Sequence, residues 1–166
     1  MSTSGTKRRR TLAASRRVLR DDPGQCVSCG ASGIVGDACA EFVCAQHGYH
    51  LVPIECARVE TTRSLHVGRS AYIGRVVSDC LVVDEIGYGT FGAVLLALQR
   101  PLLMPVAVKL LQLEQLDPEL RDELTELAIH EAGNLARLNH PNIVGLKKFG
   151  IYRGVPYIAM EFVGNG

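Results

Sequence analysis

The apolar and polar positions of the last hundred residues predict strands on both sides of a glycine-rich segment. The β-branched run from Leu81 to Ile86 predicts a strand, and Gly87-Tyr88-Gly89-Thr90-Phe91-Gly92 follows it directly. Residues 93–98 are apolar throughout, and their periodicity alone fits either a helix or a strand.

The next segment favours a second strand. Pro101 and Pro105 exclude a long helix here, and Val106-Ala107-Val108-Lys109 alternates in the manner of a strand. A lysine in this position is most simply a residue at a strand edge. The alternative is a phosphate-binding role, because the lysine follows a glycine-rich segment.

A long helix is predicted after this strand. Asp117-Pro118 is a favourable start, with Asp as the N-cap and Pro at the first helical position, and Asn139-His140-Pro141 ends the helix. Leucines at helical spacing predict an apolar stripe that faces a core: Leu120, Leu124, Leu127, Leu135 and Leu138. Glu131 falls on this stripe, where a carboxylate requires a cation, and we expect Lys109 to be its partner.

Composition sets broad limits. The chain has 166 residues and a mass of 18.0 kDa, with 47% apolar and 21% charged residues, which excludes wholesale disorder and leaves room for about one domain. No apolar run is long enough for a membrane span, and the basic residues 7–10 are not followed by the apolar segment of a signal peptide. We therefore expect a cytoplasmic protein without a membrane segment.

The charge is distributed unevenly. Residues 1–20 contain seven basic residues and no acidic one, which leaves 11 of the 18 basic residues against 17 acidic ones in the remainder. We interpret residues 1–24 as a basic, disordered leader. An arm that binds nucleic acid or an acidic membrane is the alternative, and the lack of aromatic residues between the charges argues against nucleic acid.

Residues 25–57 hold five of the six cysteines. Cys26-Val27-Ser28-Cys29-Gly30 and Cys44-Ala45-Gln46-His47-Gly48 each place two metal ligands three positions apart with glycine next, and 14 residues separate them. This spacing is typical of a four-ligand structural zinc site, here Cys26, Cys29, Cys44 and His47.

Several alternatives stay open for this segment. Cys39 or His50 could replace one ligand, and disulfides or inert buried thiols are the competing interpretation. About 30 residues bury too little apolar surface to fold unaided, which favours a metal. Cys56 and Cys80 are expected to be bystanders.

Taken together, these motifs resemble the N-terminal lobe of a eukaryotic-type serine/threonine protein kinase, most similar to bacterial members. Gly87, Gly89, Gly92 and Val94 match the glycine-rich loop with Phe91 at its tip, and Val106-Ala107-Val108-Lys109 matches the strand of the ATP lysine. Glu131 matches the glutamate of helix C. Residues 157–163 match the fifth strand and the hinge, with Met160 as gatekeeper.

The resemblance implies an α+β fold and an ATP site. The lobe is an antiparallel five-stranded sheet with helix C over residues 80–166, preceded by a connector (58–79) and the zinc-ribbon-like segment (25–57). Adenine would lie between Ile86, Val94 and Ala107 and bond to the backbone of Glu161 and Val163. The implied nucleotide-contacting set is Ile86, Gly87, Tyr88, Gly89, Thr90, Phe91, Gly92, Ala93, Val94, Ala107, Lys109, Glu131, Met160, Glu161 and Val163.

The catalytic half of a kinase is not in this sequence. It contains no His-Arg-Asp or Asp-Phe-Gly motif and no Asp after Asp122, so the chain alone lacks a catalytic base and carboxylate ligands for Mg²⁺. One hypothesis is therefore the ATP-binding part of a longer kinase that phosphorylates Ser or Thr of protein substrates. The other is a short, non-catalytic module in which the zinc ribbon binds a protein partner.

Overall fold

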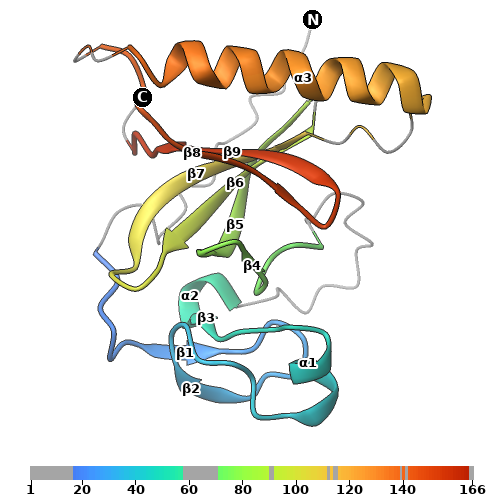
Figure 1. The fold of residues 1–166 in the computed structure, drawn as a ribbon. Helices are drawn as coiled ribbons and strands as arrows, with labels where there is room; N and C mark the ends of the chain where they lie inside the picture. Colours follow the sequence, from blue (N-terminus) through green and yellow to red (C-terminus); the bar gives the residue numbers. More distant parts are fainter. Residues whose placement is uncertain are drawn as a thin grey trace, which may run out of the picture.

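The computed structural model describes residues 17–57, 71–89, 92–111, 113, 116–138, 140 and 142–164. They form a small cysteine-bearing module (residues 17–57) that lies below a larger sheet, and a long helix crosses the opposite end of that sheet (Figure 1). Thr90 and Phe91, residues 1–16 of the expected leader and residues 58–70 of the expected connector lie outside the described residues.

The module is built from very short elements. Its antiparallel sheet has the strand order β2-β1-β3, and two single-turn helices complete it. The elements are β1 (Pro23–Gln25), β2 (Ser32–Ile34), α1 (Phe42–Gln46), β3 (Val52–Pro53) and α2 (Ile54–Ala57). Three cysteines and Leu51 are the buried residues of its own small core. So small an apolar core contributes little stability by itself.

The larger sheet confirms the predicted antiparallel architecture. Its strand order is β4-β5-β6-β7-β9-β8, so the five expected strands are present and a two-residue strand is added at one edge. The strands are β4 (Val76–Val77), β5 (Cys80–Gly89), β6 (Gly92–Gln99), β7 (Met104–Leu111), β8 (Leu146–Tyr152) and β9 (Val155–Glu161). Residues 93–98 belong to strand β6, whereas their periodicity alone fitted a helix or a strand equally well.

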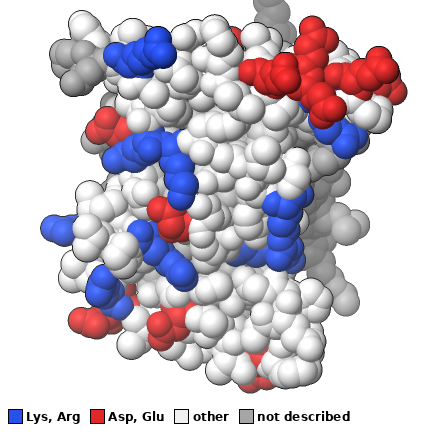
Figure 2. Space-filling model, in the orientation of Figure 1, with Lys and Arg blue, Asp and Glu red and all other residues white. Residues whose placement is uncertain are grey.

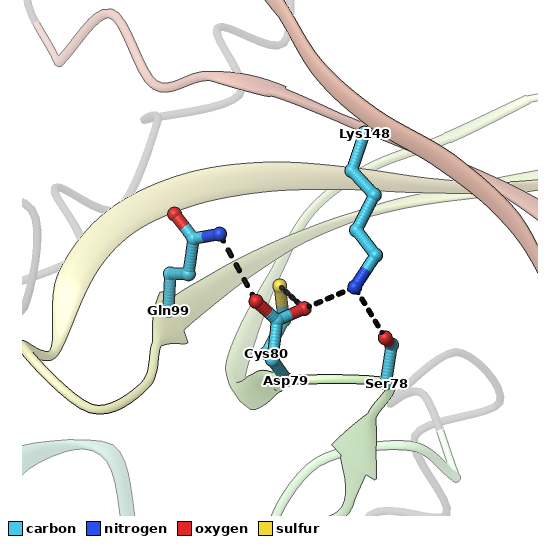
Figure 3. Close-up of polar contacts among 5 residues, drawn as sticks. All are labelled: Ser78, Asp79, Cys80, Gln99 and Lys148. Atoms are coloured by element: carbon cyan, nitrogen blue, oxygen red, sulfur yellow. Dashed lines mark hydrogen bonds and ion pairs between the residues drawn. The ribbon is translucent and has the colours of Figure 1, made fainter.

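The sheet curls until residues from its two edges meet. The Lys148 ammonium, from edge strand β8, donates to the Ser78 hydroxyl at 2.8 Å and lies 3.1 Å from a carboxylate oxygen of Asp79, in the turn between β4 and β5 (Figure 3). The Gln99 side chain donates to the other oxygen of Asp79 at 3.1 Å. The inner face of the curl encloses one apolar core, which includes Val82, Leu95, Val106, Val108 and Tyr157.

The opposite face of the sheet packs against the module. Leu81 and Val83 of β5 and Leu96 and Leu98 of β6 form a second core together with residues 18, 35, 52, 56 and 57 of the module. We call this surface of the sheet the module face. The small module therefore completes its own burial by sharing a core with the lobe.

Helix α3 (Pro118–Leu135) begins where the sequence predicts, but its orientation differs from the prediction. Four of the five leucines in the predicted stripe are exposed, with 41–53% accessible at Leu120, Leu127, Leu135 and Leu138, and the fifth, Leu124, is half-buried. Ala132 is the helix's buried residue, at 2% exposure, and it lies about 100° around the axis from Glu131. The small alanine side chain lets the helix approach strand β8, so the face that carries Ala132 (the alanine face) lies against the sheet and four of the five leucines are left outside.

The surface of α3 is acidic over its first half (Figure 2). Four exposed carboxylates gather there: Glu119, Asp122, Glu123 and Glu126. Negative charge near a helix N-terminus is favourable because it meets the positive end of the helix dipole. No helix in the described part of the chain is long and apolar enough to cross a membrane.

Candidate nucleotide-binding and metal-binding sites

The glycine-rich segment is the bend of the β5–β6 hairpin. Gly87 pairs with Val94, Tyr88 pairs with Ala93, and Gly89 pairs with Gly92, so the ladder continues to this last pair of glycines. Tyr88 is 71% exposed and Ile86 is 40% exposed. The hairpin thus projects from the sheet with little of its own chain against it.

Only one of these glycines is explained by the fold of the described residues. Gly92 has φ +120°, which favours glycine. Gly87 and Gly89 do not have positive φ, and an added Cβ would meet nothing closer than 3.9 Å at Gly87 and nothing within 4 Å at Gly89. Neither the backbone nor packing among the described residues requires glycine there. A close approach by something outside the chain would require it.

Lys109 lies beside this hairpin on the module face of the sheet. Its register partners are Val94 of β6 and Ile158 of β9, and the neighbouring row is Leu96, Ala107 and Met160. Residues directly opposite each other on adjacent strands share a face, as do positions two apart on one strand. The Lys109 side chain is half-buried, and those of Val94 and Met160 are also partly exposed. The sheet therefore offers an apolar surface with one ammonium group at its edge.

The predicted ion pair between Lys109 and Glu131 is not formed. Both residues are described, and no hydrogen bond or contact within 4.0 Å joins their charged groups; Glu131 is exposed. The reason is the orientation of α3, which turns its alanine face rather than the stripe with Glu131 toward the sheet. One contact of the expected site is thus absent from this arrangement.

The segment expected to be the hinge begins at Glu161, the last residue of β9. The backbone N–H of Glu161 donates to the carbonyl of Gly145 at 2.9 Å. Val163 is 59% exposed, and no hydrogen bond between described residues occupies its backbone N–H. Phe162, between them, is half-buried and packs against the core that the module shares with the sheet.

Four cysteines meet in the module. The sulfur atoms of Cys26, Cys29, Cys39 and Cys44 all lie within 4.8 Å of one another, and those of Cys29 and Cys39 are 3.5 Å apart. Four thiolates at about 2.3 Å from a tetrahedral zinc have sulfur atoms about 3.8 Å apart. The cluster therefore has the size and the donor chemistry for one such ion.

The structure replaces one expected ligand. Cys39 occupies the fourth position in place of His47, which is exposed and whose Nδ1 lies 2.7 Å from the carbonyl oxygen of Val43. His50 is turned elsewhere as well, with Nδ1 3.2 Å from the carbonyl of Gly48. The spacing of Cys44 and His47 resembles that of a ligand pair, which is why the sequence suggested His47. The segment contains more cysteines than the predicted ligand set used, and this excess was the feature of the sequence that could have indicated Cys39.

Local backbone contacts set up the cluster. The N–H of Cys26 donates to the carbonyl of Ala31 at 2.8 Å, and Gly30, which follows Cys29 and has φ +80°, donates its N–H to the carbonyl of Cys26 at 3.0 Å. The N–H of Cys39 donates to the carbonyl of Tyr49 at 2.9 Å, which ties the third ligand to the far end of the module. Burial raises the pKa of the Cys39 thiol to about 12 in the metal-free protein. A cation is what would favour its thiolate.

A family model for the protein kinase domain matches residues 81–166, about half of the chain. This chain belongs to the protein kinase family. The match covers the glycine hairpin, Lys109, α3 and the hinge, and it leaves the cysteine-bearing module outside.

Curated relatives agree with the family. The chain is 30% identical over 105 residues to mitogen-activated protein kinase kinase kinase 7 of Drosophila melanogaster, covering 63% of this chain and 14% of that protein. It is 34% identical over 95 residues to serine/threonine-protein kinase ATG1c of Arabidopsis thaliana (57% and 12%) and 40% identical over 88 residues to the Fps tyrosine-protein kinase transforming protein of avian sarcoma virus (53% and 16%). The chain thus spans less than a fifth of the length of these relatives.

Among solved structures, the PknI kinase domain of Mycobacterium tuberculosis is 27% identical. The similarity covers 57% of this chain and 37% of that one, with a TM-score of 0.46.

Proposed function

We propose that residues 80–164 form the ATP-binding part of a protein kinase that transfers phosphate to Ser or Thr of protein substrates. Adenine would rest on Val94, Ala107 and Met160 and bond to the hinge backbone at Glu161 and Val163. The ammonium of Lys109 would bind the α- and β-phosphates beneath the glycine hairpin. In this role Lys109 positions the nucleotide, and bond-making belongs to groups outside this chain.

The observation that carries this proposal is the free space at Gly87 and Gly89 beside Lys109 on one sheet face. Nothing among the described residues requires glycine at these two positions. Absent side chains let backbone N–H groups approach a phosphate, and the ammonium of half-buried Lys109, on the strand next to the hairpin, supplies the opposite charge. The open N–H of Val163 agrees with a donor to adenine.

In protein kinases Mg²⁺ is held by an aspartate and an asparagine of the catalytic half, and this sequence contains no Asp after Asp122, so we assign no Mg²⁺ ligand here. Lys109 and Glu131 are not paired with each other, and a kinase site needs both groups in place. Activity would therefore also require that Glu131 moves to Lys109. The lobe alone is therefore expected to bind ATP weakly and to transfer no phosphate.

The test is ³²P transfer by the protein expressed from its complete reading frame, with Lys109→Met and Lys147→Met compared at equal folded fraction. Lys147 is an exposed lysine on β8, so its replacement matches the loss of charge outside the site. The proposal expects transfer to Ser or Thr that Lys109→Met abolishes and Lys147→Met keeps. Transfer to Tyr alone would refute the Ser/Thr assignment. No transfer by a protein that carries the catalytic Asp motifs would favour the non-catalytic module.

We further infer that Cys26, Cys29, Cys39 and Cys44 hold one structural Zn²⁺. The support is the mutual approach of four sulfur atoms in a module whose own apolar core is too small to hold it together. Four protein ligands leave no open position for substrate or water, so the site would be structural rather than catalytic.

A further inference from the structure

The cysteine cluster and the hinge of the kinase lobe are connected by continuous packing. Val27 stands between the first two cysteines and packs against both apolar cores of the lobe. Phe162, in the hinge, packs against the core on the module face, which also contains Val35 and Val52 of the module. Two parts of the chain more than a hundred residues apart thus meet in one apolar cluster.

The lobe is shaped for close approach of the module. Gly74 is buried with φ +81°, and an added Cβ would lie 2.9 Å from a methyl carbon of Val27 and 3.2 Å from the Tyr49 ring. The backbone N–H of His50 donates to the carbonyl of Gly74 at 2.6 Å, and the Arg75 guanidinium lies 4.9 Å from the centroid of the Tyr49 ring. On the other side, the Arg20 guanidinium donates to the carbonyl of Pro101 at 3.0 Å. Polar contacts therefore hold both sides of the shared core.

The covered part of the module face borders the proposed nucleotide surface. Leu96, which is fully buried in the shared core, is the cross-strand partner of Ala107 and lies two positions from Val94 on β6. Two residues along a strand span about 7 Å. The module is consequently the neighbour of the adenine position as well as of the hinge.

We propose that the metal-bound module is a brace for the nucleotide site, so that metal occupancy at the four cysteines sets the order of the hinge. The module cannot hold its shape on its own small core, and the metal would fix the turn that carries Val27 against the lobe. Loss of the metal would release Val27, Val35 and Val52 from the shared core, and this is the core that Phe162 packs against. This inference rests on the proposed zinc site, and it rests on the proposed ATP site only for its functional consequence, so the hinge can be tested without nucleotide.

The test is backbone hydrogen exchange of the 166-residue chain in four forms. These are the zinc-loaded wild type, Cys39→Ser without metal, and zinc-loaded Val35→Asp and Val43→Asp. Val35 is 4% exposed in the shared core, whereas Val43 is 62% exposed on the same module, so the two substitutions are chemically identical and differ in location. Metal content is measured for each form.

The brace predicts that Cys39→Ser and Val35→Asp both raise exchange at Glu161, whose N–H donates to the carbonyl of Gly145, and at the Leu98 end of β6 by about tenfold or more. Val43→Asp should match the wild type, and the β8–β9 hairpin near Tyr152 should be protected in all four forms. If Val35→Asp keeps its zinc and exchange at the hinge still rises, the effect is caused by packing and not by loss of the metal. If Val35→Asp unfolds the whole lobe, Val35→Ala serves instead with a smaller increase.

Unchanged hinge exchange in Cys39→Ser and in the Val35 variant would overturn the brace. If the wild type binds no zinc and hinge exchange nevertheless rises in the Val35 variant, the role of the metal would be overturned. ATP affinity is then measured on the same four samples and should fall wherever hinge exchange rises. Failure to bind ATP with the exchange pattern intact would contradict the proposed ATP site and leave the brace standing.

Discussion

The Lys148 ammonium lies 3.1 Å from the Asp79 carboxylate although the strands that carry or flank these residues are the two edges of the sheet. The contact crosses the inner face of the curl, where the Gln99 side chain also binds Asp79 (Figure 3). Because it joins residues 69 positions apart, this pair contributes to the closure of the lobe rather than to a single turn.

Removing either charge of this pair should cost a small amount of stability. Both side chains are more than a third exposed, so Lys148→Met is expected to lower the free energy of unfolding by about 0.2–1 kcal/mol in urea denaturation. Lys147→Met, the adjacent and exposed lysine, should have no measurable effect. An equal loss in the two variants would contradict the edge-to-edge contact.

The same pair gives a pH dependence with a definite sign. Partial burial of Asp79 opposes ionisation, but the hydrogen bonds from Gln99 and Lys148 outweigh it and hold the pKa of Asp79 below its ordinary value of 3.8. A carboxyl with a lowered pKa in the folded state stabilises the protein above its ordinary pKa and loses this contribution as the pH falls further. The difference in unfolding free energy between wild type and Asp79→Asn should therefore be constant near neutral pH and shrink below about pH 4. A difference that grows on acidification would be inconsistent with this contact.

The metal site makes a prediction that separates Cys39 from His47. Zinc-loaded wild type should contain about one zinc per chain, and Cys39→Ser should lose it, because three thiolates remain. His47→Ala should keep the metal, since His47 lies outside the cluster. The zinc content of the two variants is measured by elemental analysis, and their stability is measured by thermal unfolding. Zinc retained in Cys39→Ser and lost in His47→Ala would restore the ligand set that spacing alone suggested.

Cys80 should be chemically inert in the folded protein. Burial is the main cause that raises the pKa of its thiol to about 12, with the nearby Asp79 carboxylate acting in the same direction. At pH 8 it is almost entirely protonated, so iodoacetamide should leave Cys80 unmodified until the protein unfolds. Peptide mass spectrometry measures this, with the exposed Cys29 of metal-free protein as the reactive reference. Rapid labelling of Cys80 under native conditions would show that it is not buried as described.

The orientation of α3 can be tested by one pair of substitutions. Leu127 is 53% exposed, so Leu127→Ala should change the free energy of unfolding by about 0.5 kcal/mol or less. Ala132 is 2% exposed, so Ala132→Leu should cost about 1–3 kcal/mol through overpacking against the sheet. A loss of 2 kcal/mol or more at Leu127 with none at Ala132 would place the leucine stripe against the core.

Local patterns predicted the order of elements in the lobe. The strand before the glycine segment, the strand ending at Lys109 and the helix starting at Pro118 each follow from short-range rules of alternation, turn residues and capping. The rotation of α3 could not be predicted in this way, because it depends on which face finds a partner. Leucines at helical spacing indicate an apolar face, but the short side chain of Ala132 allows the closer approach to β8.

In the candidate sites, too, some features follow from local sequence patterns and others depend on tertiary contacts. The position of Lys109 beside Val94 follows from a strand-hairpin-strand order that the sequence displays. The fourth cysteine and the shared core behind Phe162 depend on chain segments that meet only in three dimensions. No spacing rule connects Val27 with Phe162.

An ATP titration of the zinc-loaded chain followed by amide NMR tests directly whether this surface of the sheet binds ATP. We expect weak, saturable shifts confined to the β5–β6 hairpin, to Ala107 and Lys109, and to the hinge at residues 161–163. Lys109→Met should abolish the shifts at the hairpin, and Lys147→Met should leave them unchanged. Shifts that are absent from these segments, or that survive equally in both variants, would contradict the assignment of this surface to ATP.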